Sequence, residues 1–202
     1  MTQKTFVLCA DDFGLSPAVS AGILEAIDAG RLSATGCMTN LPSFRPAAGA
    51  LAARRGRVQA GVHLTLTAGA PLAPCPRLAP EGRLPALPVL LRAGRGDAEL
   101  RRDIGAEIGR QLDAFAEAFG GAPDFVDGHQ HVHALPLVRG ALFAELERRG
   151  WTGGPWLRDS GDALTRILRR GSSVKKALAV AALTRGFGAE ARRRGFATNE
   201  GF

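Results

Sequence analysis

The stretch Lys4-Thr-Phe-Val-Leu-Cys-Ala-Asp-Asp-Phe-Gly-Leu-Ser-Pro17 joins a short apolar run to two acids and then to the start of a helix. Residues 4–10 are mostly apolar and include Phe and Val, which predicts a buried β-strand. Ser16 is a typical N-cap and Pro17 suits a first helical turn, so we expect a helix to about Ala29. This order indicates a βα unit with polar side chains at the carboxyl end of its strand.

The same alternation continues along the chain. Apolar runs predict further strands at 34–39, 58–66, 124–133 and 156–158. Periods of three and four predict helices at 44–55, 97–119, 137–149 and 173–183. Strands that alternate with helices are typical of a parallel α/β fold, in which the carboxyl ends of the strands meet on one face.

Residues 68–96 interrupt this alternation. They hold six of the 12 prolines and show no clear period, so they predict a long loop or insertion, and such insertions are often functional. The length of 202 residues fits a single domain with a substantial core.

Charge is distributed unevenly along the chain. The net charge is +7, and residues 151–202 carry 10 Lys or Arg against 4 Asp or Glu, so most of the excess is C-terminal. Nucleic-acid binding is not expected, because aromatic residues make up only 6% and tyrosine is absent. No apolar run is long enough to predict a membrane span.

The N-terminus and the cysteines bear on the cellular compartment. The first apolar run leads directly into Asp11 and Asp12, where a signal-peptide cleavage region would have to lie, so we expect a cytoplasmic protein. Cys9, Cys37 and Cys75 form no CxxC spacing, and Cys9 and Cys37, which lie in predicted strands, are expected to be small buried side chains.

All four histidines lie in two motifs, Gly61-Val-His63-Leu-Thr-Leu-Thr67 and Asp127-Gly-His-Gln-His-Val-His133. If the second motif is a strand, alternation places Asp127 and its three histidines on one face, where a metal ion or polar cavity would satisfy them. An exposed edge strand is the alternative. His63 alone could be a core histidine, and Asp11 and Asp12 could simply cap the next helix.

Three stretches together resemble the YdjC-like carbohydrate deacetylases, a group that contains chitooligosaccharide and hopanoid-biosynthesis deacetylases. The matching stretches are ADDFGLS at 10–16, GVHLTLT at 61–67 and DGHQHVH at 127–133, in this order. The resemblance implies a distorted (β/α) barrel of the polysaccharide-deacetylase type. It also implies hydrolysis of the N-acetyl group of an amino sugar.

The resemblance further implies one divalent metal ion, magnesium or zinc, with Asp12, His63 and His129 as ligands and Asp11 as the catalytic base. Such a ligand set leaves positions open for water and substrate. His131 is the candidate proton donor, although His131 and His133 could instead only bind backbone groups. His133 and Arg158 are candidate substrate-binding residues.

Members of this family continue past an Asn-x-Gly-Phe stretch, which here is residues 199–202, so we expect either an open barrel or a truncated copy of a longer protein. An inactive paralogue that binds metal or carbohydrate is therefore one alternative function. A metal-dependent phosphoesterase is another, although such sites usually begin with histidines on the first strand. The exact sugar and the oligomeric state are left open.

Overall fold

The computed structural model describes residues 6–94 and 96–199. Five parallel strands form one sheet in the order β1-β2-β3-β4-β5. They are β1 Cys9–Phe13, β2 Ala34–Cys37, β3 Gln59–Leu64, β4 Phe125–Gly128 and β5 Trp156–Leu157. Leu157 also forms an isolated parallel bridge with Thr198. The predicted parallel α/β fold is confirmed, and closure into a barrel is not seen among the described residues.

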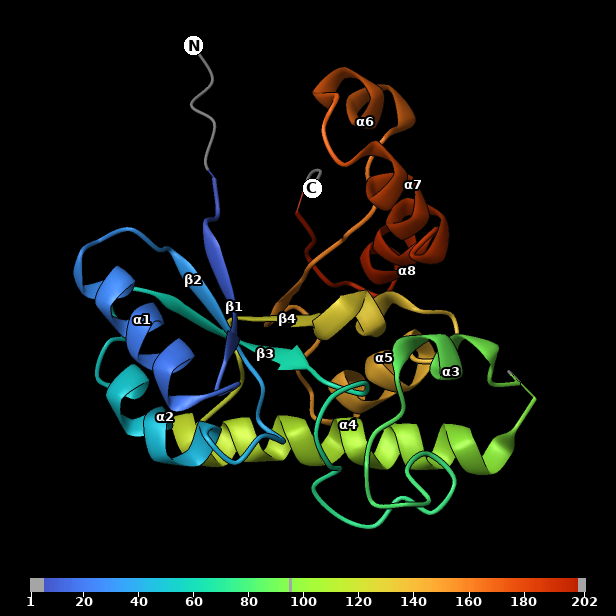
Figure 1. Ribbon diagram of the computed structural model, residues 1–202, viewed down its shortest axis with the longest axis horizontal. Helices are drawn as coiled ribbons and strands as arrows, with labels where there is room; N and C mark the ends of the chain where they lie inside the picture. Colours follow the sequence, from blue (N-terminus) through green and yellow to red (C-terminus); the bar gives the residue numbers. More distant parts are fainter. Residues whose placement is uncertain (1–5, 95, 200–202) are drawn as a thin grey trace.

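Helices lie between consecutive strands, and further helices follow the last strand. They are α1 Pro17–Asp28, α2 Phe44–Ala52, α3 Leu87–Arg92, α4 Ala98–Phe119, α5 Arg139–Arg148, α6 Leu164–Arg170, α7 Val174–Leu183 and α8 Phe187–Arg193. Because neighbouring strands are consecutive in sequence, right-handed crossovers place the connecting helices on one face of the sheet. In Figure 1, α4 and α5 lie below the sheet, whereas α6 and α7 extend away from it at the upper right.

The predicted capping residues do act as caps. The Ser16 side chain accepts a hydrogen bond from Val19 N at the start of α1. Asp97 accepts one from Leu100 N at the start of α4, and Gly120 ends that helix with a left-handed backbone. These caps fix where each helix leaves the sheet, which in turn fixes the loops at the carboxyl ends of the strands.

The first strand differs from the prediction. The sequence predicted that the two acids follow a strand over 4–10, but β1 begins at Cys9 and contains both of them. Phe6, Val7 and Leu8 precede it with largely exposed side chains. The edge of a sheet supports few apolar contacts, so these three residues do not form the buried strand that their composition suggested.

The core is one continuous cluster between the sheet and its helices. The helix α4 contributes the apolar stripe that its periodicity predicted, and the predicted insertion 68–96 packs on the same cluster through a few apolar side chains. The buried residues of these two segments include Ile104, Ile108, Leu112, Phe115, Leu78, Leu84 and Leu90. Among the described residues, no helix combines the length and apolar character needed to cross a membrane.

Candidate active site

A bulge in β1 sets the direction of the Asp12 side chain. Ala10 pairs with Thr35 and Phe13 with Cys37, so β1 has one residue more than β2 over this interval. Asp12 takes up the extra residue with φ 67°, a left-handed conformation that Asp tolerates better than most residues. The Asp12 carboxylate faces the histidines and not the start of α1, where Ser16 is the cap.

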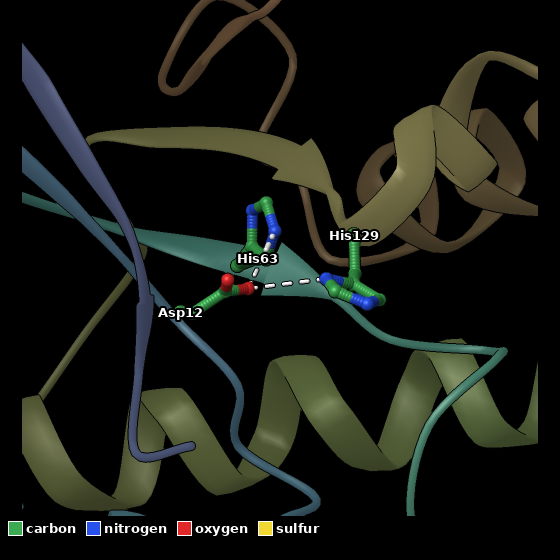
Figure 2. Close-up of side chains that lie close together, drawn as sticks. All are labelled: Asp12, His63 and His129. Carbon is green, nitrogen blue, oxygen red and sulfur yellow. Dashed lines mark hydrogen bonds and ion pairs between the residues drawn. The ribbon is translucent and has the colours of Figure 1, made fainter. Parts of the chain in front are cut away.

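Asp12, His63 and His129 converge at the carboxyl ends of three strands (Figure 2). Asp12 Oδ1 lies 3.1 Å from His129 Nδ1 and 3.3 Å from His63 Nε2. One ligand atom of each residue lies within 4.8 Å of the others. The side chain of His63 is buried, whereas those of Asp12 and His129 are partly exposed, at 31% and 25%. The cluster is therefore open to solvent on one side.

Asp127 orients the buried His63 ring. The two residues are partners in the parallel ladder between β3 and β4, and His63 Nδ1 lies 2.7 Å from Asp127 Oδ1. A carboxylate at this distance holds a proton on Nδ1, so when Nε2 gives up the proton that it shares with Asp12, its lone pair faces the centre of the cluster. An imidazole held in this way is ready to bind a metal ion through Nε2.

The charges around His63 also suit a cation. Burial by itself lowers the pKa of His63, but the charge of Asp127 and hydrogen bonds to Asp12 and Asp127 raise it to about 10. Hydrogen bonds from His129 and His63 hold the pKa of the Asp12 carboxyl well below its usual range. The acids of the pocket thus stabilise a positive charge between them. A divalent ion bound by Asp12, His63 and His129 would supply that charge.

Arg158 links the two remaining acids. Its Nη1 donates to Asp11 Oδ1 at 2.9 Å and to Asp127 Oδ2 at 2.8 Å. Asp11, Asp127 and Cys9 form a second group with metal-ligand atoms close together, but this guanidinium already forms ion pairs with both carboxylates there. The cluster of Asp12, His63 and His129 is therefore the better candidate for a metal ion.

The predicted histidine strand is wrong beyond Gly128. Strand β4 ends there, and a 3₁₀ segment, η1 (His129–Ala134), follows in which Gln130 and His131 have positive φ values of 54° and 61°. A backbone that leaves the strand geometry no longer alternates side chains between two faces. The expectation that Asp127 and all three histidines share one face therefore fails.

The last two histidines have separate surroundings. His131 Nδ1 lies 2.9 Å from Ser160 Oγ, and its pKa is lowered by burial and by the nearby charge of Arg158. His133 is fully buried, and its Nε2 lies 2.7 Å from the carbonyl oxygen of Arg158. A ring with no exposed surface does not reach a bound substrate, so His133 is placed to hold the Arg158 backbone and not to contact a sugar directly.

Two residues that support the site were not predicted from the sequence. A Cβ on Gly36 of β2 would lie 3.1 Å from His63 Cβ and 3.3 Å from Asp127 Oδ1, so glycine leaves the room that this pair needs. Buried Gln111 of α4 accepts from Thr65 N and donates to Thr65 O, which fixes the backbone just after His63. A glycine inside a predicted strand was an available signal for close approach. A polar residue within the apolar stripe of α4 was the signal for Gln111.

The chain is similar to proteins whose family or name is known. The family model described as YdjC-like protein matches residues 5–202. A carbohydrate deacetylase of Homo sapiens is 34% identical over 185 residues, which cover 83% of this chain and 56% of the relative. A chitooligosaccharide deacetylase of Enterobacter sp. (strain 638) is 36% identical over 136 residues, which cover 67% of this chain and 53% of the relative.

A solved structure from Enterococcus faecalis V583, provisionally named a cellobiose-phosphate cleavage protein, shares the fold. Its TM-score is 0.62 at 21% sequence identity, with 96% of each chain covered. The chain spans about half the length of the curated relatives it matches. Because the family model matches nearly the whole chain, the chain belongs to the YdjC-like protein family.

Proposed function

We propose that the protein hydrolyses the N-acetyl group of an amino sugar with one divalent metal ion held by Asp12, His63 and His129. The observation that carries this proposal is the convergence of these three ligand atoms in an open cluster whose buried histidine is oriented by Asp127. The names of the two deacetylase relatives support the choice of an acetylated carbohydrate as substrate. The fold supports a scaffold of the distorted (β/α) barrel type.

A divalent ion in this cluster would supply positive charge that polarises the acetamide carbonyl and favours loss of a proton from water. Asp11 would accept that proton as the water oxygen forms a bond to the carbonyl carbon. Its carboxylate is partly exposed, and the Arg158 guanidinium holds it in place at 2.9 Å. We infer that Arg158 positions Asp11. The substrate contact predicted for Arg158 would come from the exposed part of its side chain.

The carbon–nitrogen bond then breaks, and the departing amine must gain a proton. His131 is the candidate donor, because it follows His129 by two residues and its Nδ1 lies 2.9 Å from Ser160 Oγ. Its lowered pKa means that the ring is mostly neutral at pH 7, so only the protonated fraction can donate. We therefore expect His131→Ala to lower the turnover number and His133→Ala to act mainly on stability.

The donor set leaves the metal open between zinc and magnesium. Two imidazole nitrogens and one carboxylate favour zinc or a neighbouring transition metal over magnesium, which prefers oxygen ligands. Both ions belong in the test, because the family resemblance implies either one and an Asp–His–His set can bind both. The cytoplasmic location remains a prediction from the sequence.

The test is acetate release from N-acetylglucosamine and from its short β-1,4-linked oligomers. Protein stripped by a chelator should release no acetate, and activity should return with zinc or magnesium. His63→Ala should stay inactive with either ion, whereas Arg31→Ala, an exposed site just after the end of α1, should behave as wild type. Full activity after chelation would overturn the metal-dependent mechanism. Metal binding with no acetate release from any of these sugars would favour the inactive binding protein.

A further inference from the structure

A segment away from the active site has an unusual surface. Residues 164–185, here called the basic arm, contain α6 and α7, which pack against each other. Figure 1 shows these two helices extending from the upper right of the molecule, on the other side from α4. The arm begins four residues after Ser160, whose hydroxyl contacts His131. Its first residue is therefore close in sequence to a residue of the candidate active site.

The basic arm exposes apolar side chains. Helix α7 has the sequence Val-Lys-Lys-Ala-Leu-Ala-Val-Ala-Ala-Leu, and none of its residues is buried. In contrast, α1 buries Ile23 and Ile27 from a similar apolar content. Leu164 and Leu168, one turn apart in α6, are 58% and 56% exposed. Exposed apolar side chains gathered in one segment are typical of an interaction surface.

The charge of the basic arm has one sign. It contains six basic residues and no Asp or Glu. Arg166 Nη1 lies 3.9 Å from Asp162 Oδ1, at the limit of an ion pair. Two of the three lysines in the chain lie here, next to each other in α7. The basic residues are Arg166, Arg169, Arg170, Lys175, Lys176 and Arg185.

We propose that the basic arm binds the surface of an anionic lipid membrane. Short helices that combine exposed leucines with Lys and Arg lie in the membrane interface, with the leucines among the acyl chains and the cations at lipid phosphates. At ten residues, α7 is too short to cross a bilayer, so the arm would lie on the membrane. The proposal concerns membrane binding and does not depend on the proposed deacetylase activity.

Other partners explain the surface less well. A symmetric contact with a second copy would bring two segments of charge +6 together, which is repulsive. Nucleic acid would match the charge but not the leucines, and the arm has no aromatic side chain to stack on bases. An anionic lipid surface accounts for both the cations and the leucines.

The test is cosedimentation of the whole chain with vesicles of phosphatidylcholine, alone or mixed with phosphatidylglycerol. We expect binding only to the mixed vesicles. Lys175→Gln with Lys176→Gln should weaken it by about 25-fold, since each cation near an anionic surface contributes about 5-fold. Arg31→Gln with Arg83→Gln removes the same charge from exposed sites elsewhere and should have little effect.

The leucines are tested with Leu164→Gln and Leu168→Gln together. This variant should still bind mixed vesicles at low salt but should be released at about 1 M salt, where charges are screened within about 3 Å. Circular dichroism of each variant would confirm that the helices are retained. The proposal is overturned if wild type ignores mixed vesicles, if it binds duplex DNA as tightly as vesicles, or if light scattering shows a dimer that the leucine variant abolishes.

Discussion

The candidate active site and the basic arm both depart from the usual distribution of side chains: the site buries charged groups, and the arm exposes apolar ones. The site buries an ionised pair, Asp127 and His63, beneath the partly exposed Asp12. The arm exposes leucines and leaves α7 without a buried residue. Buried charge needs a compensating charge, and exposed apolar surface needs a cover. The two regions therefore point to different partners, a metal ion in one and a lipid surface in the other.

Among changes at the candidate active site, substitution of Asp11 should have the largest effect on the turnover number. Asp11→Asn should retain the metal ion and lower the turnover number by about 10²–10⁴-fold, the usual loss when a general base is removed. Steady-state kinetics with metal analysis on the same sample would measure both. Asp28→Asn, at an exposed ion pair near the end of α1, is the matched control and should be close to wild type. Loss of the metal in Asp11→Asn would show that the roles of the two acids are exchanged.

A smaller effect is expected at Asp127, which contacts His63 without facing the open side of the cluster. Asp127→Asn should weaken metal binding by about 10–100-fold, because the imidazole loses the carboxylate that orients it. Competition with a chromogenic chelator would give the dissociation constant. An unchanged constant would mean that the packing of the strands, and not Asp127, holds the His63 ring.

The buried His133 gives a pH dependence to the stability of the whole fold. Burial lowers its pKa to about 4, so the unfolded chain takes up a proton at higher pH than the folded chain does. Stability should therefore fall as the pH drops from about 6.5 toward 4, by about 2 kcal/mol at pH 5 from this group alone. Urea unfolding at several pH values should show a shallower loss in His133→Asn. Equal pH slopes would contradict this assignment.

The smallest effect is expected at Gly36. In Gly36→Ala the new Cβ presses on His63 and Asp127, so metal binding should weaken a few-fold while the fold survives. Gly22→Ala is the matched control, because a Cβ there meets nothing within 4 Å and a helical Gly→Ala change should stabilise by about 0.5–1 kcal/mol. Metal binding that is equal in both variants would show that β2 adjusts without moving the pair.

Much of the fold could be predicted from the sequence because the signals are local. The apolar period of α4 and the caps Ser16 and Asp97 act within one or two turns of the chain. The convergence of Asp12, His63 and His129 was also predictable, because parallel strands bring their carboxyl ends together. The bulge at Asp12 could not be predicted, because the extra residue is seen only when β1 is aligned with its partner strand β2.

The directions of His131 and His133 could not be predicted for a related reason. Strand alternation was applied beyond Gly128, where the backbone turns through two residues with positive φ. Gln130 is not a residue that commonly signals such a turn, and a single histidine, although enriched at positive φ, is a weak signal inside an apparent strand. The link between Arg158 and Asp11 was also hidden, because it joins residues 147 apart in the sequence across three intervening strands.

The central claim is that one metal ion is bound by Asp12, His63 and His129. The most direct measurement is anomalous diffraction on either side of the zinc absorption edge from crystals grown with zinc. We predict one anomalous peak, about 2.0–2.3 Å from Asp12 Oδ1, His63 Nε2 and His129 Nδ1. A peak among Cys9, Asp11 and Asp127 instead, or no peak at the carboxyl ends of the strands, would contradict the account.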